Sequence, residues 1–173
     1  MRTDWLFRRE MEHLLAALTP ANRLALDVSM ATGLRLGDVL NLKREQLAQR
    51  FTVREQKTGK TRRVFLSNEL LKRALALAGK VYVFEGRTSD KKHRTRQAVF
   101  KDLKRVARIF RLKVNVAPHT ARKIYAVEAY HKTGDLKRVQ RLLNHSGETV
   151  TALYAMADEL VSRHHKKKTP TKK

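Results

Sequence analysis

Apolar residues recur along most of the chain at the spacing of amphipathic helices. Five of them mark the first predicted helix: Leu6, Met11, Leu14, Leu15 and Leu18. Pro20 then interrupts the pattern. A second apolar helix is predicted over residues 21–32, where Gly33 supplies a typical C-terminal glycine. Residues 36–42 predict a short helix that carries Asp38.

The pattern changes to alternation in residues 51–55 and again in residues 62–66. Thr58 and Gly59 lie between the two segments and form a turn signal. These residues predict a small antiparallel hairpin with Lys57 near its tip.

The middle of the chain returns to helices and loops. Ser67 is expected to cap a helix that ends at Gly79. Residues 81–84 are compatible with a short strand. Residues 86–96 are strongly basic and lack periodicity, so we predict an exposed loop there.

Helices also dominate the last third of the chain. A basic helix is predicted over residues 95–112, with four apolar residues facing inward: Val99, Leu103, Val106 and Phe110. Pro118 opens the next helix, Asp135 caps another over about residues 136–143, and a helix over residues 148–157 holds Tyr154. The elements together predict a mainly α fold with a small antiparallel β-hairpin, in the α+β class.

The composition adds a strong positive charge to this helical pattern. The 173 residues include 39 Lys+Arg and 16 Asp+Glu, for a formal net charge of +23. A folded domain with such a field most often binds nucleic acid, and its binding depends strongly on salt. The length predicts one domain. A membrane-surface protein is the weaker alternative, because the charge is spread along the chain and not confined to one amphipathic helix.

The absence of cysteine narrows the chemistry further. A chain without cysteine has no disulfide, no thiolate nucleophile and no Cys-based zinc site. The first residues lack the apolar stretch of a signal peptide, and no apolar run approaches the ~18 residues of a membrane helix. We therefore expect an intracellular protein that faces nucleic acid.

Six residues with complementary chemistry for phosphodiester cleavage follow one another along the chain: Arg35, Lys57, His119, Arg122, His145 and Tyr154. A phenol has a pKa of about 10, and nearby guanidinium groups favour its nucleophilic, ionised form. Two arginines can donate paired hydrogen bonds to a phosphorane in place of a metal ion. The lysine is a candidate general acid for the departing 5′-oxygen, and the histidines can orient the phosphate or accept the phenol's proton. The set predicts cleavage without a metal or another cofactor.

Each member of this set also has an ordinary structural explanation. Lys57 is typical of an exposed turn, His119 and His145 lie near helix boundaries, and Tyr154 is typical of a core aromatic. The order and spacing of the six residues together, and no single member, indicate catalysis.

The segments that carry these residues resemble the tyrosine recombinase family, also called phage integrases, over nearly the whole chain. Five matches support the resemblance: the first arginine box Ala31-Thr32-Gly33-Leu34-Arg35 with its acidic companion Asp38, the hairpin lysine Lys57, the box His119-Thr120-Ala121-Arg122, the box Leu143-Asn144-His145-Ser146, and the nucleophile Tyr154. Two positions beside these boxes depart from the family pattern. Asn144 stands where glycine is usual, and Lys123 stands where histidine is common.

The resemblance implies a tyrosine recombinase catalytic fold and cleavage that leaves a 3′-phosphotyrosine and a free 5′-hydroxyl. It implies double-stranded DNA as partner, strand exchange through a Holliday junction, and a tetramer on DNA in which the segment after Tyr154 packs on a neighbouring protomer. We expect a cytoplasmic protein at the nucleoid, in a bacterial, archaeal or phage context. Five basic residues are candidate DNA contacts: Lys60, Arg62, Arg94, Arg96 and Lys123.

The expected domain arrangement is a catalytic domain over residues 1–163 and a basic flexible tail over residues 164–173. Relatives usually carry an N-terminal core-binding domain, which we expect this chain to lack, either as a fragment or as a minimal enzyme. Two other functions stay open, a type IB topoisomerase and a DNA-binding regulator without turnover. The compact box from His119 to Arg122 and the short spacing from His145 to Tyr154 favour the recombinase.

Overall fold

The computed structural model describes residues 6–143 of the chain. Residues 1–5 and 144–173 lie outside the described part, and the predicted helix over residues 148–157 falls among them. The chain divides into two units, one up to Tyr125 and one from Ala126 onward, and each is described by itself.

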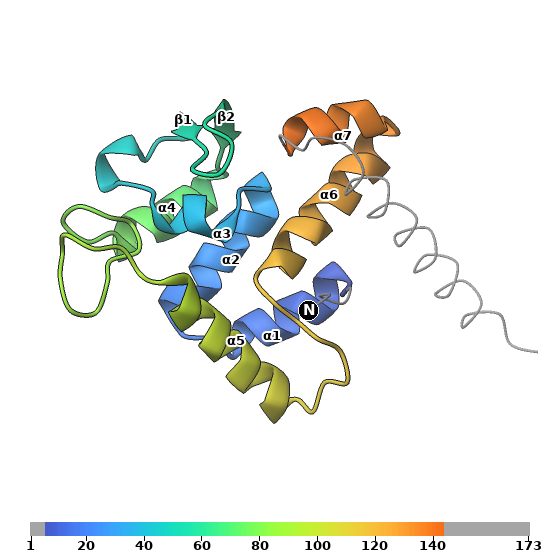
Figure 1. The fold of residues 1–173 in the computed structure, drawn as a ribbon, viewed down its shortest axis with the longest axis horizontal. Helices are drawn as coiled ribbons and strands as arrows, with labels where there is room; N and C mark the ends of the chain where they lie inside the picture. Colours follow the sequence, from blue (N-terminus) through green and yellow to red (C-terminus); the bar gives the residue numbers. More distant parts are fainter. Residues whose placement is uncertain (1–5, 144–173) are drawn as a thin grey trace, which may run out of the picture. The chain divides into compact units, whose positions relative to one another are not determined.

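The first unit is mainly helical and contains one β-hairpin (Figure 1). Its elements are α1 (Arg8–Ala16), α2 (Pro20–Thr32), α3 (Leu36–Leu40), a 3-10 helix (Arg44–Gln46), β1 (Arg50–Arg54), β2 (Thr61–Phe65), α4 (Asn68–Leu77), α5 (Arg96–Ile109) and the start of α6 (His119–Thr133). This architecture confirms the predicted fold class of helices with a small antiparallel sheet.

Helix α2 is the centre of the first unit. It contacts α1, α3, α4 and α5, and its apolar side chains are buried on several sides, including Leu24, Leu26 and Met30. Because neighbouring helices cover it in different directions, α2 is buried around most of its circumference. Pro20 lies in its first turn, where the missing N–H of proline costs no hydrogen bond.

A tight turn after α2 leads directly to the candidate site. Gly33 ends the helix in the left-handed conformation, with φ +68° and its N–H bonded to the carbonyl of Ser29 at 2.8 Å. A Cβ atom at this position would lie 2.4 Å from the ring of Tyr125 on α6. Glycine is therefore required both by the backbone angle and by the close approach of the ring.

The hairpin has an inward and an outward face. Strands β1 and β2 pair antiparallel, with Val53 opposite Arg62 and Phe51 opposite Val64. Val53 and Val64 are buried, whereas the intervening residues point to solvent. By the same alternation, Arg62 faces inward together with Val64.

A polar network joins α5 to the connection between α1 and α2. The Asp102 carboxylate accepts hydrogen bonds from the backbone N–H of Thr19 at 3.0 Å, from the Thr19 hydroxyl at 2.9 Å and from the Asn22 amide at 2.7 Å. Arg105 donates to the other carboxylate oxygen at 2.7 Å. Burial opposes ionisation of Asp102, but these hydrogen bonds outweigh it and lower the pKa to about 2.

Two sequence predictions need correction in this unit. Phe110 is half exposed and does not face inward, because α5 ends at Ile109 and Arg111 then adopts a positive φ of 50°. The buried position beside Val106 is taken by Ala107 instead. Residues 81–84 form only an isolated bridge, between Tyr82 and Lys43.

The basic segment over residues 86–96 is more constrained than a freely exposed loop. The Arg94 N–H donates to the carbonyl of Phe84 at 2.6 Å, and the Gly86 N–H donates to that of Lys92 at 2.7 Å. The segment ends in the N-cap of α5, where the Thr95 hydroxyl accepts from the Ala98 N–H at 3.1 Å.

The second unit contains the rest of α6 and, within its described residues, α7 (Leu136–Leu142). Gly134 has a φ of +62°, and the Asp135 side chain accepts from the Arg138 N–H at 3.0 Å. The predicted aspartate cap is thus confirmed. In residues 6–143, no helix is long and apolar enough to cross a membrane.

Candidate active site

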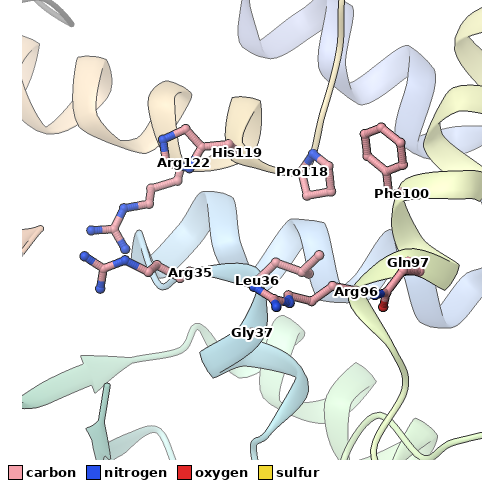
Figure 2. Close-up of a pocket in the computed structure, with 9 residues that line it drawn as sticks. All are labelled: Arg35, Leu36, Gly37, Arg96, Gln97, Phe100, Pro118, His119 and Arg122. Carbon is pink, nitrogen blue, oxygen red and sulfur yellow. The ribbon is translucent and has the colours of Figure 1, made fainter. Parts of the chain in front are cut away.

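A concave site of about 420 Å³ opens in the first unit between the starts of three helices (Figure 2). Arg35 and Leu36 come from the start of α3, Arg96 from the start of α5, and His119 and Arg122 from the first turns of α6. Residues more than eighty positions apart in the sequence therefore face one cavity.

Arg35 is the first arginine of this site. It is the N-cap residue of α3, directly after the turn made by Gly33. Its side chain is 20% exposed, and its NH1 group donates to the Glu55 carboxylate at 2.5 Å. The guanidinium is thus bonded on one side to a buried acid, while the residue also lines the open cavity.

Arg122 supplies the second guanidinium from α6. Arg122 is only 2% exposed, and Figure 2 shows its guanidinium beside that of Arg35. Burial, and then the positive charge of Arg35, lower the pKa of Arg122 to about 10. It stays protonated at neutral pH, so two adjacent positive charges face the cavity.

His119 is the first residue of α6 and lies one helical turn before Arg122 on the same wall of the cavity (Figure 2). The spacing of three residues places the two side chains on one face of the helix. The His-x-x-Arg pattern in the sequence therefore corresponds to one local surface.

Two carboxylates lie behind the arginines. Asp38 is 3% exposed and accepts from the Gln56 N–H at 2.9 Å, and burial raises its pKa above the ordinary value. Glu55 is fully buried, which opposes its ionisation, but hydrogen bonds from Arg35 and Thr58 hold its pKa below the ordinary value. A buried anion is stable here because it is paired and hydrogen-bonded.

The sequence predictions missed Glu55, and they assigned Arg62 a different role. Arg62 has a side chain only 9% exposed, lies 3.7 Å from Glu55 and donates to the Thr32 carbonyl. One signal in the sequence could have identified both residues. Glu55 follows the inward Val53 by two positions, just after β1, and Arg62 precedes the inward Val64 of β2 by two positions. The alternation therefore predicts that both charged side chains face inward, where an unpaired charge would be costly.

Lys57 lies in the turn between β1 and β2, as predicted, and its side chain is exposed. Its two neighbours are both tied to the carboxylates behind the arginines. The Gln56 N–H donates to Asp38, and the Thr58 hydroxyl donates to Glu55 at 3.0 Å.

The structure brings together three of the six predicted catalytic residues in one cavity, Arg35, His119 and Arg122, and joins the Lys57 turn to them. His145 and Tyr154 lie outside the described residues. Their roles stay predictions.

The predicted DNA contacts differ in their exposure. Lys60 and Arg96 are exposed, and Arg96 also lines the cavity. Arg94 is half-buried and donates to the Asn22 side chain at 2.6 Å. Arg62 and Lys123 are buried, so their positions do not support direct contact with DNA. The inward alternation of β2 explains this placement for Arg62.

This geometry is suited to binding a phosphate group. Guanidinium groups present planar forks of donors that match phosphate oxygens, and here two forks share one cavity with a histidine. Within residues 6–143, no group of three or more His, Cys, Asp or Glu side chains could hold a metal ion.

Comparisons with known proteins agree with this arrangement. The phage integrase family matches residues 4–160 of the chain. A tyrosine recombinase of Thermosipho africanus is 31% identical over 162 residues, which cover 87% of this chain and 56% of that protein. Tyrosine recombinase XerD of Pseudomonas aeruginosa is 32% identical over 179 residues, which cover 90% of this chain and 60% of XerD. The chain thus spans little more than half the length of these relatives.

A solved structure shares the fold. A lambda integrase tetramer bound to a Holliday junction superposes with a TM-score of 0.68 at 21% identity, over 88% of this chain and 48% of the integrase chain. The match to the family extends over most of the sequence and includes every box around the cavity. The chain therefore belongs to the phage integrase family.

Proposed function

We propose that this chain is the catalytic domain of a site-specific DNA recombinase that cleaves and rejoins double-stranded DNA through a 3′-phosphotyrosine. The observation that carries the proposal is the pair of guanidinium groups, Arg35 and Arg122, that face one cavity beside His119. These groups form a binding site for one phosphate whose charge increases during the reaction.

In the proposed reaction, the phenolic oxygen of Tyr154 forms a bond to the scissile phosphorus while the bond from phosphorus to the 5′-oxygen breaks. The phenol's proton passes to a histidine, and the Lys57 ammonium protonates the departing 5′-oxygen. The products are a 3′-phosphotyrosine and a 5′-hydroxyl. Attack by a 5′-hydroxyl reverses these steps and releases the tyrosine, so joining needs no ATP.

The two arginines stabilise the transition state by charge and by hydrogen bonding. A phosphorane carries more negative charge on its non-bridging oxygens than the phosphodiester does, so donors fixed at that place bind the transition state more tightly. Loss of one such donor costs about 10²–10³ in rate. The pKa of about 10 for Arg122 keeps this donor charged at the pH where cleavage is measured.

The proposed partners follow from the charge and from the relatives. A net charge of +23 favours a DNA partner, and the lambda integrase that shares the fold forms a tetramer on a Holliday junction. We assign residues 1–163 to the catalytic domain and the basic residues 164–173 to additional contact with DNA. The protein would act at a bacterial or archaeal nucleoid or on phage DNA.

The test is trapping of the covalent intermediate. The chain is incubated without magnesium on a nicked duplex, from which the short 5′-hydroxyl strand diffuses away after cleavage. We expect a covalent protein–DNA adduct that Tyr154→Phe abolishes and that Tyr82→Phe, a loss of a phenol outside the cavity, leaves unchanged. A wild-type chain that binds this duplex and forms no adduct would refute catalysis and leave a DNA-binding regulator.

A further inference from the structure

Glu55 is the one fully buried acid behind the cavity in the described part of the chain, and it makes contacts in three directions. One carboxylate oxygen, Oε2, accepts from Arg35 NH1 at 2.5 Å and from the Thr58 hydroxyl at 3.0 Å. The other oxygen, Oε1, lies 3.7 Å from Arg62 NH1. A single oxygen atom thus connects the first arginine of the cavity with the turn of the hairpin.

The backbone strengthens this connection. The Glu55 N–H donates to the carbonyl of Lys60 at 2.9 Å, and the Gly59 N–H donates to the carbonyl of Glu55 at 2.9 Å. The turn that carries Lys57 is thus closed on Glu55 itself. On the other side of Lys57, the Gln56 N–H is bonded to Asp38, three residues after Arg35 on α3.

We propose that Glu55 is a positioning residue that sets the place of Arg35 and of the Lys57 turn together. This inference rests on the proposed function, in which Arg35 stabilises the phosphorane and Lys57 protonates the 5′-oxygen. Glu55 is fully buried, so it acts through these two groups and does not touch DNA.

The charge of Glu55 matters as well as its hydrogen bonds. Arg35, Arg62 and Arg122 interact electrostatically at this place, and their mutual repulsion disfavours three cations so close together. A carboxylate among them offsets this repulsion and holds the Arg35 guanidinium from its buried side. Because one NH group of Arg35 is bonded to Glu55, the carboxylate restricts the orientations that the planar guanidinium can adopt beside the cavity.

The two functions of Glu55 can be separated by substitution. Thr58→Val keeps the shape of the side chain but removes the hydroxyl that joins Glu55 to the Lys57 turn. The same hydroxyl also accepts a long hydrogen bond of 3.4 Å from the Lys60 N–H, which this variant loses as well. Thr58→Ser keeps the hydroxyl. Glu55→Gln removes the negative charge that lies beside Arg35, with little change in side-chain volume. Thr52→Val, on the exposed face of β1, is the matched control.

A substrate with sulfur in place of the departing 5′-oxygen distinguishes the two functions. A thiolate leaves without protonation, so this substrate does not need a placed general acid, although it still needs the arginines. Lys57→Ala serves as the reference, because it removes only the general acid. Its cleavage rate on the sulfur substrate shows how much of the wild-type rate that substrate restores. All variants are compared as the full 173-residue chain, with thermal unfolding measured for each.

We expect Thr58→Val to slow cleavage of ordinary DNA by about 10–100-fold, because small misplacement of a reacting group has costs of this size. The sulfur substrate should restore its rate to that of wild type, as for Lys57→Ala. Thr58→Ser and Thr52→Val should cleave both substrates normally. Glu55→Gln should stay slow on the sulfur substrate, because Arg35 is also displaced.

Three results would overturn this role. Thr58→Val could cleave ordinary DNA within twofold of wild type, its defect could persist on the sulfur substrate, or a folded Glu55→Gln variant could cleave as wild type does. If wild type forms no adduct with either substrate, the proposed function itself fails, and this role fails with it.

Discussion

The turn at Gly33 offers a quantitative test of how the fold positions the site. Gly33→Ala places a methyl group 2.4 Å from the Tyr125 ring, in a residue with φ +68°. Tyr125 follows Arg122 by one helical turn on α6. The tight turn at Gly33 leads to Arg35 at the start of α3. The substitution should therefore disturb both arginines of the cavity as well as the stability of the first unit.

The magnitude follows from two terms. An alanine in the left-handed region costs about 1–2 kcal/mol, and forcing a methyl group into a filled space costs about 1–3 kcal/mol more. Gly33→Ala should then lower the free energy of unfolding by roughly 2–5 kcal/mol. Gly59 and Gly134 have nearly the same φ, +66° and +62°, with no atom within 4 Å of an added Cβ. Alanine at Gly59 or Gly134 should therefore cost only the backbone strain of about 1–2 kcal/mol.

The assay is urea unfolding followed by circular dichroism, with the three alanine variants measured beside wild type. The change that alanine makes in the unfolded chain is similar at all three positions and cancels in the comparison. We expect Gly33→Ala to be the least stable by at least about 1 kcal/mol, and to form less covalent adduct under conditions where it is folded. Equal costs at Gly33 and Gly59 would show that the contact with Tyr125 does not matter.

Three further predictions concern the arginine fork, an acid-sensitive network and the basic end of the chain. Arg35→Lys keeps one charge but loses the planar fork, so adduct formation should slow by about 10²–10³ while DNA affinity in a filter-binding assay is retained. Asp102 has a pKa lowered from 3.8 to about 2, so its stabilisation of about 2 kcal/mol is complete above pH 4 and is lost as the pH falls to about 2; acid unfolding of Asp102→Asn should lack this dependence. Deleting residues 164–173, which contain five lysines, should weaken DNA binding and reduce its salt slope.

Each of these predictions has a control or a contrary result. Arg63→Lys changes an exposed arginine on the outer face of β2 and should cleave normally; equal loss in both lysine variants would contradict a special role for Arg35. Identical acid unfolding of wild type and Asp102→Asn would remove Asp102 as the source of acid sensitivity. An unchanged salt slope after the deletion would show that residues 164–173 do not contact phosphates.

The helices of this protein could be predicted because their boundaries are local. Pro20 and Gly33 bound α2, and Ser67 and Asp135 cap the helices that follow them through side-chain oxygens. Phe110 shows the limit of such arguments. Its spacing from Val106 fits an inward face only if the helix continues, and the backbone of Arg111 ends the helix instead.

The candidate site could be predicted only where its residues lie in recognisable boxes. Arg35, His119 and Arg122 were identified from sequence order, and the structure places them in one cavity. Glu55 could not be found in this way, because its meaning depends on Arg35 and Arg62, which reach it from other parts of the chain. The sequence predicts Arg62 as a DNA contact, because a basic residue in a basic protein gives no sign of burial except its place in the strand alternation.

In the proposed reaction, a phenol of this chain attacks a phosphate held by two arginines. The most direct measurement of this step is mass spectrometry of the adduct trapped in EDTA, after digestion with trypsin and nuclease. We predict a nucleotide attached through its 3′-phosphate to the peptide that contains Tyr154. Attachment at another residue, attachment through a 5′-phosphate, or an adduct that forms only with a divalent metal would refute this mechanism.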